Sequence, residues 1–264
     1  MPATALLDWT LSQFQSYLLV LMRVAPILFL MPALSSRSLP NLLKIGLTLT
    51  IGLILLPGVK IDPALLPSDP YSFGFFLIAE LMIGFILALS VQIVFAGIQV
   101  GGELASFQMG LSMANVVDPA SDINSPIISE FLYLLTLVLF FAVDGHHWFF
   151  QAVGQSFLLL PPGEIHLQPG IYRHFMHLLG NLFVIAIKIS APVMAVLIFT
   201  QIALGILAKA VPQVNILMTS FPVTIGLGLL FLAFSLDLIL PYSAVLSQEA
   251  GRGLVSTLLP LMRR

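Results

Sequence analysis

Long runs of apolar residues, interrupted by proline, glycine and a few charges, dominate the pattern of this 264-residue chain. A helix needs about 20 mainly apolar residues to cross a bilayer, and about six runs come close to that length. These runs cover residues 14–34, 42–56, 73–100, 127–143, 178–207 and 214–240. A shorter apolar stretch, 148–160, has the length of an interfacial or re-entrant piece. The pattern predicts an all-α, polytopic integral membrane protein, whose helical segments, broken by proline and glycine, are arranged as helical hairpins.

The segment from Gly101 to Pro126 joins two of these runs and has the composition of irregular backbone. It contains no Lys or Arg, it opens with Gly101 and Gly102, and two prolines punctuate it. In lipid, irregular backbone leaves its N–H and C=O groups unsatisfied, so it must be buried in protein or line a watery cavity. We therefore expect an irregular element at the middle of the molecule that passes or blocks something.

Small and flexible residues surround the start of this segment. Gly97 and Gly101 stand four residues apart and Gly102 follows, a pattern that allows close backbone approach between membrane helices. Met109 and Met113 have a spacing of four residues, which places them on one face of a helical turn. Such a pair usually reflects ordinary packing, whereas in a pore flexible thioether side chains can form a deformable seal. The spacing leaves both interpretations open.

The composition supports a membrane protein and excludes several other classes. Hydrophobic residues make up 59% of the chain and charged residues only 8%, whereas a soluble domain is about 25% charged. The mean hydropathy is +1.06, and a formal net charge of -2 gives no basis for nucleic-acid binding. The absence of cysteine excludes disulfides and thiolate metal sites. A cleaved signal peptide is not expected, because Asp8 precedes the first basic residue, Arg23.

Among the ionisable residues inside the apolar runs are Arg23, Glu80, Lys188 and Asp237. At membrane depth such a group costs at least ~2.5–3.5 kcal/mol unless it is paired or wet. We expect neighbouring subunits or channel water to satisfy these groups, as buried or intersubunit charges. Structural pairing is favoured over a direct role in transport.

The candidate catalytic and metal-binding groups carry weak signals. Asp144, His146 and His147 form the one cluster that resembles a metal or proton-relay site, but adjacent histidines point in different directions on a helix. His174 and His177 have a spacing of three residues, yet no recognisable second set of ligands accompanies them. The central serines lack a Gly-x-Ser-x-Gly elbow. We therefore predict no catalytic residue, no metal and no cofactor.

Several strings occur in a fixed order along the chain: Arg23-Val-Ala-Pro, Gln108-Met-Gly-Leu-Ser, Asp118-Pro, Asp144-Gly-His, Ser156-Phe, Lys188-Ile-Ser-Ala-Pro and Ala210-Val-Pro-Gln-Val-Asn. In this order they resemble the FliR family of flagellar biosynthetic proteins, which includes the SctT subunits of virulence injectisomes. The resemblance runs from about Arg23 to Gly228, and the chain is more similar to the flagellar branch.

The resemblance implies a non-enzymatic core subunit of the type III secretion export gate, which passes unfolded flagellar proteins. One such chain joins about five FliP-type and about four FliQ-type subunits, and an FlhB-type switch protein is a further partner. Residues 1–175 are similar to a FliP-type fold and residues 176–264 to a FliQ-type hairpin. The location implied is the bacterial inner membrane, within the basal body and raised toward the periplasmic side.

In this family the central segment plugs the closed pore, and it maps onto about 106–122 here. The plug residues implied are Ser106, Phe107, Gln108, Met109, Gly110, Leu111, Ser112, Met113, Asp118, Pro119 and Asp122.

A secondary transporter of a small solute is the rival interpretation, because broken helices and charges at mid-membrane are expected there too. No convincing inverted repeat supports it. A transporter should purify alone or as a symmetric oligomer, whereas an export subunit should need unlike partners.

Overall fold

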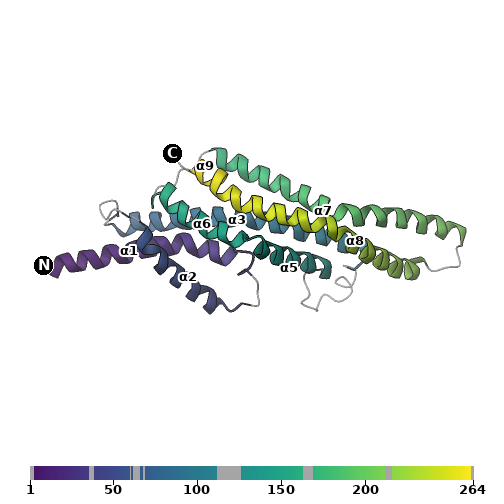
Figure 1. The fold of residues 1–264 in the computed structure, drawn as a ribbon, viewed down its shortest axis with the longest axis horizontal. Helices are drawn as coiled ribbons and strands as arrows, with labels where there is room; N and C mark the ends of the chain where they lie inside the picture. The colour runs from purple at the N-terminus through teal and green to yellow at the C-terminus, as the bar shows by residue number, and fades with distance from the viewer. Residues whose placement is uncertain are drawn as a thin grey trace. The chain divides into compact units, whose positions relative to one another are not determined.

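A computed structural model describes residues 3–35, 39–59, 61, 66–67, 69–111, 126–162, 169–211 and 216–262. Every regular element in these residues is a helix (Figure 1), which confirms the all-α prediction. The elements are α1 (Ala3–Leu30), α2 (Asn41–Leu55), a 3-10 turn (Leu56–Gly58), α3 (Pro70–Met109), α5 (Ile127–Ala142), α6 (Gly145–Leu159), α7 (Pro169–Ala210), α8 (Ile216–Gly253), a π-helical turn (Leu254–Leu258) and α9 (Leu259–Met262). Five of the described helices are long and apolar enough to cross a membrane, and α5 with α6 would make a sixth as a broken span or re-entrant loop.

Proline does not end the long helices. Pro26 lies inside α1, Pro192 inside α7, and Pro222 and Pro241 inside α8. The sequence pattern predicts breaks at such positions, whereas the structure continues the helix through each of them. Membrane helices tolerate proline because neighbouring helices, hydroxyl side chains and local adjustments satisfy the backbone groups that it frees.

The described chain forms two compact units, and three of the helices contribute to both. The first unit contains residues 1–92, 144–176 and 249–264. In it α1 and α2 lie side by side, and the Tyr17 hydroxyl donates a hydrogen bond to the Leu49 carbonyl at 3.0 Å. The C-terminal end of α8 packs on α6, where the Arg252 guanidinium lies 5.5 Å from the centre of the Trp148 ring.

The second unit contains residues 93–143 and 177–248. Its core includes Phe95 of α3, which is fully buried and meets Tyr133 and Phe140 of α5 edge to face. The ring centroids are 6.0 and 5.6 Å apart, within the range that aromatic pairs prefer. The division predicted at residue 175 concerns likeness to two other folds rather than compactness, and it stays a prediction.

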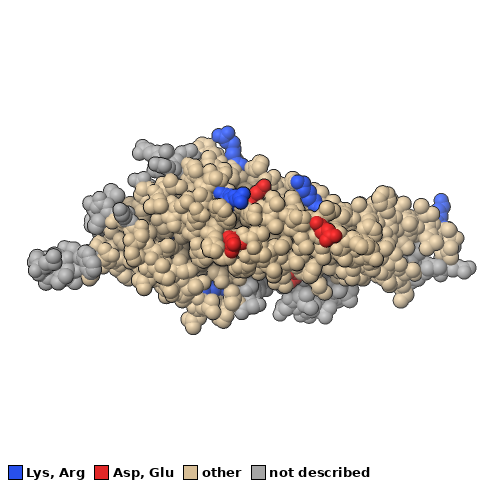
Figure 2. Space-filling view, viewed as in Figure 1, with Lys and Arg blue, Asp and Glu red and all other residues tan. Residues whose placement is uncertain are grey.

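Apolar side chains cover much of the surface. Figure 2 shows charged residues only at scattered points on the visible face. Large hydrophobic residues are exposed on every long helix, among them Leu53 of α2, Phe75 of α3 and Phe199 of α7. Exposed apolar patches of this kind mark contact with lipid or with other proteins.

Candidate functional site

The end of α3 is the feature closest to the predicted plug. The Leu111 amide donates to the Ser106 carbonyl at 3.1 Å, and the Gly110 amide donates to the Phe107 carbonyl at 3.0 Å. Gly110 has a φ of 87°. This pair of bonds around a left-handed glycine is the Schellman motif, which satisfies the last carbonyls of a helix and stops it. The helix therefore ends at a defined point, with Gly110 as the residue that turns the chain.

The helix also continues further than the sequence pattern predicts. The expectation of irregular backbone from Gly101 onward is wrong for residues 101–109, because α3 runs to Met109. Glycine usually weakens a helix by about 1 kcal/mol, but here the missing side chains allow close contact with two other helices. That packing holds the helical backbone through the glycine pair.

Those contacts are made by the three glycines with α7 and α5. A Cβ atom placed on Gly97 would lie 3.1 Å from the Leu182 carbonyl oxygen, and one on Gly101 would lie 3.0 Å from that of Ala186. A Cβ atom on Gly102 would lie 2.5 Å from Cα of Ser129. The Ser129 hydroxyl also donates to the Gln99 carbonyl at 3.0 Å, which ties α5 to the same turn of α3.

The first predicted plug residues have different surroundings. Phe107 is 72% exposed, whereas Ser106 and Met109 are fully buried. The Ser106 hydroxyl has no hydrogen-bond partner among the described residues. Gln108 donates from its amide to the side-chain oxygen of Gln201 on α7 at 3.2 Å.

The burial of Met109 changes its expected role. Its side chain is part of the packed core of the second unit, so it is not a free, deformable seal within this chain. Ser112, Met113, Asp118, Pro119 and Asp122 lie outside the described residues.

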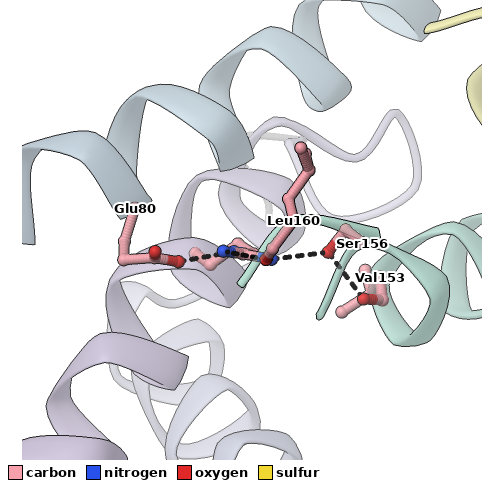
Figure 3. Close-up of polar contacts among 5 residues, drawn as sticks. Glu80, Val153, Ser156 and Leu160 are labelled. Atoms are coloured by element: carbon pink, nitrogen blue, oxygen red, sulfur yellow. Dashed lines mark hydrogen bonds and ion pairs between the residues drawn. The ribbon is translucent and has the colours of Figure 1, made fainter. Parts of the chain in front are cut away.

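A buried charge network joins three elements of the first unit (Figure 3). Nε of Arg23 on α1 donates to a carboxylate oxygen of Glu80 on α3 at 2.5 Å, and both side chains are fully buried. The two terminal nitrogens of Arg23 donate to the Leu160 carbonyl at 3.1 Å each, and one also donates to the Ser156 hydroxyl at 3.3 Å. The guanidinium lies 4.2 Å from the centre of the Phe157 ring. Arg23 and Glu80 therefore form a buried ion pair within the chain, while an intersubunit role for them stays a prediction.

Sequence reasoning placed Arg23 and Glu80 in apolar runs but did not find the groups that complete the network. Ser156 and Leu160 lie 133 and 137 residues from Arg23. Ser156-Phe157 is one of the strings that carry the family resemblance, and this was the one sequence signal that pointed to Ser156 as a functional residue.

Lys188 and Asp237 have a different setting. Both side chains are exposed on this chain, in the second unit. Nζ of Lys188 lies 5.3 Å from the centre of the Tyr242 ring, a cation–π distance. Among the described residues neither forms an ion pair.

Asp144, His146 and His147 bring candidate ligand atoms to within 4.8 Å of one another. Asp144 has a φ of 56° and precedes α6, and its carboxylate lies 3.5 Å from Nδ1 of His147. Asp144 and His147 are exposed, so the cluster lacks the enclosed four-ligand set of a structural zinc site.

Comparison with known proteins identifies the family. A family model described as bacterial export proteins, family 1, matches residues 14–250. The flagellar biosynthetic protein FliR of Escherichia coli (strain K12) is 31% identical over 243 residues, which cover 90% of this chain and 91% of that protein. FliR of Bacillus subtilis (strain 168) is 30% identical over 229 residues, which cover 86% of this chain and 88% of that protein. The chain therefore belongs to the FliR family of bacterial export proteins.

Proposed function

We propose that this chain is a core, non-enzymatic subunit of the flagellar type III export gate. In this role it forms part of a channel for unfolded flagellar proteins. Its partners are FliP-type and FliQ-type subunits and an FlhB-type switch protein, and it contributes one copy to the assembly. Membership of the FliR family and the length of its apolar helices support the proposal.

The observation that carries the proposal is the mismatch between α7 and a bilayer. This helix has 42 residues, so at 1.5 Å per residue it is about 63 Å long. The hydrocarbon core of a bilayer is only about 30 Å thick. To fit inside it, α7 would have to tilt by about 60°, beyond the upper limit of about 40° for membrane helices.

Exposed apolar side chains nevertheless follow α7 over its whole length. Tyr172 and Met176 are exposed near one end, Phe183 and Ile187 in the middle, and Ile206 near the other end. Lipid cannot cover all of this surface, because much of the helix must lie outside the hydrocarbon. Other protein surfaces are therefore needed along α7, which supports a subunit of a larger assembly over a transporter that works alone.

The exposed mid-helix charges support the same interpretation. Lys188 lies near the middle of the apolar helix α7, where contact with lipid would cost at least ~2.5–3.5 kcal/mol. In an assembly raised out of the membrane plane, this position faces a partner or channel water. We propose that the chain lies in the bacterial inner membrane, within the flagellar basal body, and is raised toward the periplasmic side.

We further propose that the segment from Ser106 to Asp122 plugs the closed pore. Support comes from where α3 stops: its capped end fixes the point at which the chain leaves the helix. Within this proposed segment, Met109 is packed in the core of the second unit, whereas Phe107 is 72% exposed.

Purification on a tagged copy of this chain, followed by native mass spectrometry, tests the assembly. We expect a hetero-oligomer that contains a single copy of this chain together with unlike membrane subunits. A soluble, stable homo-oligomer in detergent would contradict the export-gate function and favour a transporter.

A further inference from the structure

We propose that Thr224 and Gly228 of α8 are positioning residues that hold the end of α3 as a fixed base for the plug. This inference rests on the proposed plug function and adds the residues that set where the plug begins. All the residues concerned lie in the second unit.

The first contact is polar. The Thr224 hydroxyl is buried and donates a hydrogen bond to the Met109 carbonyl at 3.0 Å. Met109 is the last residue of α3, and the helix leaves its final carbonyls without intrahelical partners. The single proton of this hydroxyl is shared with two carbonyls within α8, those of Ser220 at 3.0 Å and Phe221 at 3.2 Å. Thr224 thus connects the end of one helix to the backbone of another.

The second contact is steric. The Met109 side chain fills the space above Gly228: a Cβ atom at Gly228 would lie 2.5 Å from Cγ of Met109 and 2.9 Å from its Sδ and Cε. Real Cβ atoms essentially never come so close, so any side chain here must displace Met109. The absence of a side chain at Gly228 therefore creates the pocket that Met109 occupies.

The turn after Met109 is held from the same helix. The Phe221 ring lies against Gly110, where an added Cβ atom would come within 2.9 Å of it. Phe221, Thr224 and Gly228 follow one another at spacings of three and four residues, so they share one face of α8. One face of α8 thus contacts the side chain and the carbonyl of Met109 and the turn at Gly110.

Gly228→Ala tests the pocket, with Gly226→Ala as the matched control. Both changes exchange glycine for alanine in the same helix, so the gain in helix propensity is the same. Among the described residues, a Cβ atom at Gly226 meets no atom within 4 Å beyond the adjacent backbone of its own helix. We expect Gly228→Ala to assemble yet raise ion leakage at least threefold, while Gly226→Ala stays as tight as the unmodified gate. Equal leakage in both variants would overturn the inference.

Thr224→Val and Thr224→Ser test the polar contact. Valine keeps the branched shape but removes the hydroxyl, whereas serine keeps the hydroxyl. We expect the valine variant to leak ions and the serine variant to stay as tight as the unmodified gate. A tight Thr224→Val gate would show that the hydrogen bond to Met109 does not position the plug.

A cysteine pair tests whether the base stays fixed while substrates pass. The chain contains no cysteine, so Met109→Cys with Gly228→Cys introduces the one pair in this subunit. We expect an oxidant to form the disulfide in the assembled gate, and we expect the oxidised and reduced forms of this same variant to export equally per assembled complex. Export that stops on oxidation and returns on reduction would overturn a fixed base, as would failure of the disulfide to form.

A gate that lacks residues 112–117 separates this inference from the plug function on which it rests. If that deletion leaks and Gly228→Ala does not, the plug exists but α8 does not position it. If the deletion assembles and stays tight, the plug function itself is wrong. Leakage is measured as ion conductance, or as the sensitivity of growing cells to small toxic solutes, at matched complex yield.

Discussion

Gly84 on α3 lies directly against the backbone carbonyl of Arg23 on α1. A Cβ atom at Gly84 would overlap the Arg23 carbonyl oxygen and lie 3.0 Å from its carbonyl carbon. The contact is between backbones, so neither side can yield by a change of rotamer. Glu80, one turn earlier on α3, binds the side chain of the same arginine. The close approach of the two backbones at Gly84 therefore brings the Glu80 carboxylate within hydrogen-bonding distance of the Arg23 side chain.

Gly84→Ala should destabilise the first unit by about 1–3 kcal/mol, the usual cost of overpacking a tight contact. Gly74→Ala is the control on the same helix, because a Cβ atom there contacts no described residue within 4 Å outside the adjacent backbone of α3. Thermal unfolding of the purified complex is the measurement, with complex yield as a second readout. Equal midpoints for the two variants would mean that α1 and α3 move apart at little cost.

Glu80→Leu should lower stability strongly, because it leaves Arg23 buried without its carboxylate partner. Breaking a buried ion pair in this way commonly costs about 3–5 kcal/mol. The double variant Glu80→Leu with Arg23→Met should recover part of the loss, since no unpaired charge remains. A double variant less stable than Glu80→Leu alone would show that the bonds from Arg23 to Ser156 and Leu160 matter more than the ion pair.

Gly101→Leu should disrupt the packing of α3 on α7. Its Cβ atom would already lie 3.1 Å from Cβ of Ile189, and the rest of the leucine side chain needs space that the interface lacks. Gly180→Leu on α7 is the control, since a Cβ atom at Gly180 contacts none of the residues that the structure describes within 4 Å, apart from the adjacent backbone of α7. We expect low complex yield for the first variant and normal yield for the second. Normal assembly and export of Gly101→Leu would mean that this interface yields easily.

Lys188→Leu should lower the yield of the hetero-oligomer without changing the fold of the chain itself. The Lys188 side chain is exposed in the second unit, so its charge matters for the partner or channel water that faces it. Lys209→Leu is the control, because Lys209 is also exposed but lies in the last turn of the same helix. Co-purification of unlike subunits is measured. Equal recovery with both variants would indicate that position 188 faces water.

Deletion of residues 112–117 should leave an assembled gate that leaks ions. The deletion starts after Leu111, so it spares the Schellman motif and the buried Met109 side chain. Export should persist or fall mildly, because an open pore still admits substrate. An assembled deletion variant as tight as the intact gate would mean that another layer of the channel forms the seal.

The sequence predicted the helices well where apolar runs were long, and less well where glycine carried two possible meanings. Gly101 and Gly102 fit both a helix interface and the start of an irregular segment. The structure shows close contact with α7 and α5, and α3 continues to Met109. Which meaning holds depends on whether another helix lies against the glycines, and that information is not local.

Long-range polar pairing escaped prediction for a similar reason. Arg23 and Glu80 were recognised as charges that need partners, yet they are 57 residues apart and nothing in either run points to the other. Thr224 and Gly228 carried no chemical signal, because a hydroxyl and a missing side chain acquire a role only when Met109 lies against them. The family resemblance predicted a plug but not the helix face that holds its base.

The wide separation of the Arg23 partners along the chain has a consequence for biosynthesis. The candidate membrane span Thr10–Leu30 contains Arg23 and is made first, whereas Glu80 follows 57 residues later and the Leu160 carbonyl 137 residues later. During translation, α1 therefore enters the membrane with an uncompensated cation, at a cost of at least ~2.5–3.5 kcal/mol. Arg23 gains its counter-charge once Glu80 is made, but its terminal nitrogens lack their backbone acceptor until the ribosome has passed Leu160. A chain truncated before that point should therefore be retained or degraded rather than assembled.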